Sequence, residues 1–215
     1  MNTHAFTLQT TQLIARPSGA LFVPECATLV VSDLHLGKSD RIARRTGILV
    51  PPFENRDTLL RLEAEIDATG AETVICLGDS FDDLAAGQSL DEEETLWLAR
   101  LQAGRDWIWV EGNHDPGPLD LGGSHRTEVA LAALTFRHIA QIGATGEVSG
   151  HYHPKHRLGG QSRPAFLYDK DRLILPAFGT YTGGLWSDAP ALKTLFQGPF
   201  VAVLTGRKAI AVPVL

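Results

Sequence analysis

Carboxylate, imidazole and amide side chains follow several apolar runs in this sequence. The donors, each directly after such a run, are Asp33 and His35, Asp79, Asn113, His138, and His151 with His153. These oxygen and nitrogen ligands suit divalent Mn, Fe or Zn better than a soft thiolate site would. The sequence therefore predicts a metal site. If two cations lie close together they need a bridging anion, and Asp79 is the natural candidate.

The spacing within these motifs has a geometric consequence. Side chains two positions apart in an extended chain face the same side. Asp33 and His35 are therefore expected to converge on one point, and so are His151 and His153. Glycine also precedes three of the donors, where it permits tight turns and close approach of the backbone. These glycines are Gly78, Gly112 and Gly150.

The elements that must position these donors alternate in the first half of the chain. Apolar runs predict strands at 27–33, 72–80 and 106–115, and amphipathic patterns predict helices at 56–70 and 90–102. This alternation is typical of an α/β layered fold. Ligand sites of such sheets lie beyond the carboxyl ends of the strands, which is where the donors fall.

The second half is richer in strands. Short strands are predicted at 133–138 and 147–153, and hairpins at 165–178 and 200–215. Helices are scarce there, and no linker, repeat or low-complexity segment interrupts the chain. We therefore expect a single domain over residues 1–215, with a mixed α/β architecture.

Composition narrows the class of protein. The chain has 215 residues, of which 44% are hydrophobic, and its formal net charge is −6. Such a chain can bury a core, and its acidity argues against a surface that coats nucleic acid generally. Cys26 and Cys76 are expected to be reduced thiols in or near the core. No signal peptide or membrane-spanning run is visible, so a cytoplasmic location is expected.

Taken in order, the motifs DLH, GDSFDD, GNHD, the later His138 and GHYHP resemble those of the calcineurin-like metallophosphoesterases. The resemblance implies a four-layer αββα sandwich of two mixed β-sheets flanked by helices. It also implies two metals, one held by Asp33, His35, Asp79 and His153 and the other by Asp79, Asn113, His138 and His151. His114 would be the catalytic histidine and Asp115 would orient it. His125 is an alternative to His138, which is preferred because it ends an apolar strand.

The resemblance implies a two-metal-dependent phosphodiesterase in which a metal-bound hydroxide attacks phosphorus. Mn is the first metal expected, with Fe or Zn as alternatives. The stretches DLHLGKSDRIARRTG, GHYHP and LILPAFGTYTGGL further resemble the PdeM-type subgroup, the ligase-associated DNA-damage-response endonucleases of bacteria. A nuclease of this kind is expected to act on DNA ends or single-stranded DNA, and the subgroup implies DNA ligase and helicase as pathway partners.

Other functions stay open on the sequence. A small-molecule phosphoesterase is the main alternative, whether a phosphomonoesterase, a cyclic-nucleotide phosphodiesterase or a nucleotide-lipid pyrophosphatase. A binding scaffold without turnover is a third hypothesis, and the complete ligand set weighs against it. No oligomer is specified, although edge strands in the second half would allow a dimer.

Several polar residues have two interpretations each. Lys38, Arg41, Arg44 and Arg45 form either a basic patch that binds the substrate backbone or an ordinary solvated helix face. Tyr181 and Trp186 either stack on a base or, for Trp186 especially, pack beneath their loop. Asp82 and Asp83 either orient metal ligands or cap a helix.

Overall fold

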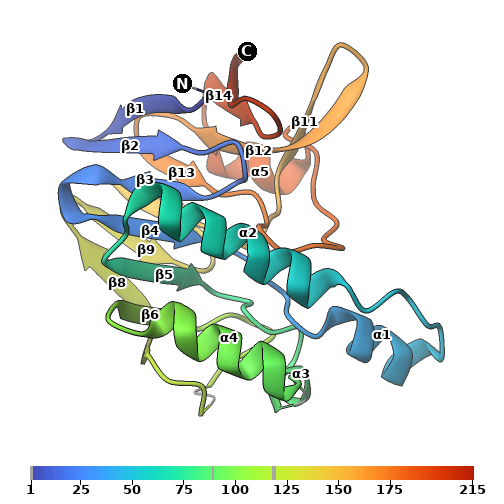
Figure 1. Ribbon diagram of the computed structural model, residues 1–215. Helices are drawn as coiled ribbons and strands as arrows, with labels where there is room; N and C mark the ends of the chain where they lie inside the picture. Colours follow the sequence, from blue (N-terminus) through green and yellow to red (C-terminus); the bar gives the residue numbers. More distant parts are fainter. Residues whose placement is uncertain (1, 89, 118–119) are drawn as a thin grey trace.

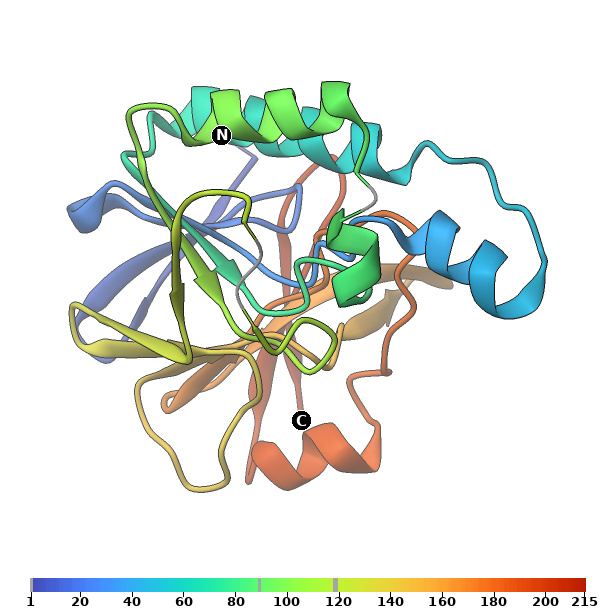
Figure 2. The same cartoon turned by 90° about the horizontal axis from the view of Figure 1, so that it is seen from below.

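Two β-sheets stack face to face, and helices cover both outer faces, as Figures 1 and 2 show. The computed structural model describes residues 2–88, 90–117 and 120–215. The layer order is helix, sheet, sheet, helix, so the αββα fold predicted from the sequence is confirmed.

The first sheet is mixed and has seven strands in the order β1-β2-β3-β4-β5-β6-β7. Strands β1 to β4 are antiparallel neighbours, whereas β4 to β7 run parallel. Their bounds are β1 His4–Leu8, β2 Thr11–Ala15, β3 Leu21–Val23, β4 Thr28–Val31, β5 Thr73–Leu77, β6 Asp106–Val110 and β7 Ser124–Arg126. The parallel half carries the first three donor motifs.

The second sheet has the order β15-β14-β12-β13-β10-β9-β8, with β11 paired to β12. Its bounds are β8 Glu128–Leu131, β9 Leu134–Arg137, β10 Glu147–Ser149, β11 Lys155–Leu158, β12 Gln161–Tyr168, β13 Arg172–Ile174, β14 Phe200–Leu204 and β15 Ile210–Val214. Strand β10 is parallel to both β9 and β13, and the other pairs are antiparallel. The two predicted hairpins are therefore confirmed.

Five α-helices complete the described chain: α1 Lys38–Thr46, α2 Glu54–Thr69, α3 Leu84–Gln88, α4 Glu92–Gln102 and α5 Pro190–Leu195. A short 3₁₀ turn, Pro24–Cys26, precedes β4. Figure 2 shows α2 and α4 over the first sheet and α5 under the second, whereas α1 projects to one side. Helix α4 begins with a capping box in which Asp91 accepts from the Glu94 amide.

Alternation along the central strands explains why three apolar layers form. Leu29 and Val31 of β4 pack beneath α2 and α4, whereas Val30 points between the sheets. Because successive strand side chains point to opposite faces, a strand covered on both faces must be apolar throughout. A third cluster joins α5 to the outer face of the second sheet. Among the described residues, no helix is long and apolar enough to cross a membrane.

Candidate metal centre

The predicted donors lie in the loops that directly follow β4, β5, β6, β9 and β10. The first three of these strands are parallel neighbours in one sheet, and the last two are parallel neighbours in the other. Parallel strands end at the same edge, so each sheet presents its donors from one edge. The stacking of the sheets then brings the two sets together.

One group of donors consists of Asp33, His35 and His153. Asp33 Oδ1 lies 3.1 Å from His153 Nε2, and that nitrogen lies 3.4 Å from His35 Nε2. The other Asp33 oxygen accepts from the Ser32 hydroxyl and from the His151 backbone N–H. Both Asp33 oxygens thus help to hold the His151 loop, since Oδ1 also accepts from the His151 N–H at 3.3 Å, and Oδ1 in addition faces the ring of His153.

A second group consists of Asp79, His138 and His151, with Asn113 beside it. His138 Nε2 lies 3.3 Å from Asp79 Oδ2, 3.0 Å from Asn113 Oδ1 and 3.3 Å from His151 Nδ1. Asp79 Oδ1 accepts from a backbone N–H, as one oxygen of Asp33 does. The groups adjoin, because His138 Nδ1 is 3.9 Å from Asp33 Oδ1.

The donor chemistry of both groups fits bound cations. His138 donates its Nδ1 proton to the Leu77 carbonyl at 3.1 Å, which turns Nε2 toward Asn113 Oδ1 and Asp79 Oδ2. In the other group the Nε2 atoms of His35 and His153 face each other. Imidazole nitrogens and carboxylate or amide oxygens that converge in a buried site are the ligand set of a divalent cation. Each group would therefore suit one divalent cation.

The local charges favour ionised carboxylates. Burial alone would raise the pKa of Asp79, but the neighbouring His138 outweighs it and holds that pKa at about 2. Burial alone would likewise raise the pKa of Asp33, but the contact with His153 outweighs burial and lowers that pKa. The pKa of His138 is raised, since the contact with Asp79 outweighs its desolvation. Both carboxylates are therefore charged at neutral pH and available as ligands.

The backbone of the ligand loops corrects one prediction. Strands β4 and β10 end at Val31 and Ser149, so the motifs Asp33–His35 and His151–His153 are not extended. These four residues and Asp79 instead have positive φ, at 54°, 47°, 69°, 45° and 47° respectively. Such left-handed conformations cost about 1–3 kcal/mol each for residues with a side chain, and they cluster at functional sites. His151 and His153 join different groups, whereas Asp33 and His35 share one.

Close packing explains the glycines of the site. A Cβ at Gly112 would lie 2.1 Å from the Asp79 nitrogen, and one at Gly150 would lie 1.8 Å from Ser32 Oγ. A Cβ at Gly78 would lie 2.2 Å from the His138 ring. The prediction that glycine allows close backbone approach here is confirmed.

Two glycines of the GTYTGG loop, residues 179–184, have the same role. A Cβ at Gly179 would lie 2.0 Å from the Leu34 carbonyl oxygen, and one at Gly184 would lie 2.0 Å from the His153 carbonyl oxygen. The Gly179 N–H also donates to the Asp33 carbonyl at 3.1 Å. This loop therefore packs directly on two ligand loops, one from each sheet.

Asp82 and Asp83 each take one of the two roles that the sequence left open, which are orienting a metal ligand and capping a helix. Asp82 Oδ1 lies 2.8 Å from His35 Nδ1, so it orients that ring and turns Nε2 toward the site. Asp83 accepts from the Ala86 N–H at 2.7 Å and caps α3. Although burial raises the pKa of Asp82, His35, Arg41 and Lys38 together hold it below its usual range.

His114 is placed at the site, but not by the residue that was predicted to orient it. Its Nδ1 donates to the Asp82 carbonyl at 2.8 Å, and its Nε2 lies 4.0 Å from Asp79 Oδ2. The Asp115 carboxylate instead accepts from the backbone amides of Gly112, Asp79, Ser80 and Phe81. Burial, assisted by the charge of Asp79, raises the pKa of Asp115 to about 6. Asp115 is therefore a support for the Asp79 loop.

Helix α1 carries the four cations predicted to bind substrate, and three of them have carboxylate partners. Lys38 and Arg41 lie 3.1 and 2.9 Å from Asp82, and Arg44 lies 2.9 Å from Asp83. Arg45 is exposed, and within the described chain it forms no ion pair. Neutralised cations attract a phosphate less strongly than free ones, so the structure weakens the case for this helix as the main phosphate-binding surface.

Other side chains singled out in the sequence lie elsewhere. His125 is on β7, in register with Trp109, and belongs to neither donor group. Tyr152, between the two histidines, packs against the cluster beneath α5. Cys76 is buried, Cys26 is half-buried, and both are free thiols.

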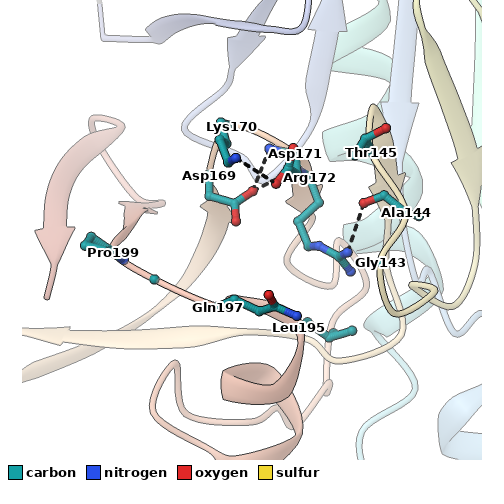
Figure 3. A pocket seen from close by; sticks show the side chains of 11 residues that line it. Gly143, Ala144, Thr145, Asp169, Lys170, Asp171, Arg172, Leu195, Gln197 and Pro199 are labelled. Carbon is teal, nitrogen blue, oxygen red and sulfur yellow. Dashed lines mark hydrogen bonds and ion pairs between the residues drawn. The ribbon is translucent and has the colours of Figure 1, made fainter.

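A cavity of about 700 Å³ lies at the other end of the second sheet (Figure 3). Its buried Arg172 begins β13, whose far end faces the donors. The guanidinium is already engaged by Glu147 at 3.2 Å and by the carbonyls of Gln141 and Ala144. None of the predicted metal ligands lines this cavity. It is therefore separate from the donor groups.

Comparison with known proteins agrees with this geometry. The crystal structure of Pseudomonas putida nuclease MPE is similar to this chain, with a TM-score of 0.78 and 25% sequence identity over 99% of this chain and 100% of that one. Among curated protein sequences, none matches. The family model for calcineurin-like phosphoesterases matches residues 27–203, which include every predicted ligand. On the donor motifs, the fold and this match together, the chain belongs to the calcineurin-like phosphoesterase family.

Proposed function

We propose that this phosphoesterase is a two-metal-dependent phosphodiesterase that cleaves nucleic-acid phosphodiester bonds. The observation that carries the proposal is the pair of adjoining donor groups, each completed by a buried carboxylate. Two divalent cations, when bound, supply Lewis acidity and lower the pKa of a coordinated water. The likeness to a bacterial nuclease supports nucleic acid as the substrate class.

Each donor group would hold one cation, and Asp79 would lie between the two. The proposed ligands are Asp33, His35 and His153 for the first cation and Asn113, His138 and His151 for the second. Carboxylate, imidazole and amide donors suit Mn²⁺, with Fe²⁺ or Zn²⁺ as alternatives. The chain's own contribution is to keep these donors fixed before the substrate arrives, since the strained loops admit little rearrangement.

His114 is the proposed catalytic side chain. Its Nδ1–H is held by the Asp82 carbonyl, so its Nε2 is turned toward the site, and the side chain is 27% exposed. A protonated Nε2 can donate to a phosphoryl oxygen or to the departing alkoxide. Asp79 Oδ2 lies 4.0 Å from this nitrogen, so His114 borders the second donor group.

The proposal is tested by comparing hydrolysis of bis-p-nitrophenyl phosphate with that of p-nitrophenyl phosphate. The protein is first chelated and then refilled with Mn²⁺, and its metal content is measured. Faster diester hydrolysis by protein with two bound Mn²⁺ supports the proposal. Faster monoester hydrolysis would point to a small-molecule phosphatase instead. No hydrolysis of either compound by the loaded protein would contradict the proposal.

We expect Asp82→Asn to weaken Mn²⁺ binding by about 10–100-fold, because the substitution removes the charged partner of His35. Calorimetric titration of the chelated protein measures this. Asp83→Asn is the matched control, because its ion pair with the exposed Arg44 contributes little to stability and asparagine still caps a helix. Equal affinities in the two variants would show that Asp82 does not position His35.

The resemblance also implies a role in DNA repair, with DNA ligase and helicase as pathway partners. These two points remain predictions.

A further inference from the structure

Two cations on β11 lie over one aromatic ring beside the donor groups. Lys155 Nζ is 4.6 Å and the Arg157 guanidinium carbon 4.1 Å from the centre of the Trp186 ring. Lys155 is also hydrogen-bonded through its backbone to Leu185 and Ser187, which fixes the segment that carries the tryptophan. Trp186 is therefore a platform for two cations, and the predicted stacking of a base on this ring would have to displace them.

These cations differ from those of α1 in their electrostatic partners. Within the part of the chain that the structure describes, neither Lys155 nor Arg157 has a carboxylate within ion-pair distance, whereas Lys38, Arg41 and Arg44 all do. An aromatic face holds a cation without cancelling its charge. In a protein with a net charge of −6, such cations are the ones that attract a phosphate most strongly.

The surface leads directly from the donor groups. A cavity of about 180 Å³ is lined by His153, a proposed ligand, together with Lys155, the hydroxyls of Ser162 and Thr182, and Gly183. A second cavity, of about 240 Å³, is lined by Arg157 and Trp186. Exposed Asp188 also lines this second cavity, but within the described chain it forms no ion pair with Arg157.

The spacing suits a polymer. Lys155 and Arg157 are two residues apart on a strand, or about 6.6 Å. That is comparable with the separation of neighbouring phosphates along an extended single strand. Figure 1 shows the β11–β12 hairpin standing out from the sheets, where a long substrate could pass without crossing the core.

We propose that Lys155 and Arg157 bind successive phosphates of single-stranded nucleic acid next to the phosphate being cleaved. The inference rests on the proposed phosphodiesterase activity and adds the path of the substrate. Recognition through phosphates alone is independent of base sequence. The surface therefore selects chain length, since a dinucleotide-sized or smaller diester does not span it.

The test uses the full chain loaded with Mn²⁺ and the double variant Lys155→Gln/Arg157→Gln. Two substrates are compared, a labelled single-stranded oligodeoxynucleotide and bis-p-nitrophenyl phosphate. We expect the ratio of kcat/KM for the oligonucleotide to kcat/KM for the small diester to be lower in the double variant than in the wild type, on the order of tenfold or more. The change should come from a higher KM for the oligonucleotide. The plot of log kcat/KM against log salt concentration should become shallower by about 1.4, because each contact to a single strand contributes about 0.7.

Lys170→Gln/Lys193→Gln is the control, since it removes equal charge from exposed positions away from the donors. The single variant Arg157→Lys retains Lys155 and keeps the charge at position 157. It should therefore keep most of the wild-type ratio. An unchanged ratio and salt slope in the double variant would overturn the inference, and so would a wild type that cleaves only the small diester. A wild type that cleaves neither substrate would instead overturn the proposed function.

Discussion

Asp79→Asn is expected to lower metal-dependent diester hydrolysis by on the order of 10³-fold, which corresponds to about 4 kcal/mol of transition-state stabilisation. Asp79 is the carboxylate between the two donor groups: one oxygen accepts from the His114 N–H and the other faces His138 at 3.3 Å. Asparagine keeps the shape and one acceptor oxygen but removes the charge. Activity and Mn²⁺ stoichiometry are measured on the same samples.

The matched control for this variant is Asp67→Asn, which makes the same atomic change on the exposed side of α2. It should leave turnover and metal content at the wild-type level. Two bound Mn²⁺ and turnover within tenfold of wild type for Asp79→Asn would show that the charge of Asp79 is not needed by either cation.

Gly112→Ala is expected to lower the same activity by about 10²-fold, without any donor being removed. The new Cβ would lie 2.1 Å from the Asp79 nitrogen, 2.2 Å from Asp79 Oδ1 and 2.6 Å from Asp115 Oδ1. Backbone cannot rotate away as a flexible side chain can, so the Asp79 loop has to shift. Overpacking of this kind also costs about 1–3 kcal/mol of unfolding free energy, which urea denaturation measures.

Gly198→Ala is the control for this substitution, because a Cβ there has nothing within 4 Å. It should keep wild-type activity and stability. If Gly112→Ala were as active as Gly198→Ala, the position of the Asp79 loop would not be set by its contact with Gly112.

The basic residues illustrate what the sequence alone does not show. The run KSDRIARR is dense in charge and adjacent to the first donor motif, so it was the natural candidate for a substrate surface. Its partners, Asp82 and Asp83, are about forty residues away in the chain and become neighbours only on folding. Lys155 and Arg157 form no such conspicuous run. Their position over Trp186 depends on pairing between segments separated by the whole of β12 and β13.

The N-terminal strands and the ligand loops show the same limit. Strands β1 to β3 are short and partly exposed, so their apolar pattern did not predict them. The positive φ of Asp33, His35 and Asp79 has no local signal, because residues with side chains disfavour that conformation. Packing from both sheets imposes it. Extended geometry was therefore the wrong reason for expecting these donors to converge, although they do.

The sequence by itself determined the layered α/β fold, the donor residues and the order in which they occur. Apolar runs and the polar residues that end them are local features, and period-two and helical patterns can be read from them directly. Only the tertiary structure decided which donors share a group, that Asp82 rather than Asp115 approaches the histidines, and which cations lack a carboxylate partner. Those properties depend on distances between loops of two different sheets, and stacking of the sheets sets these distances.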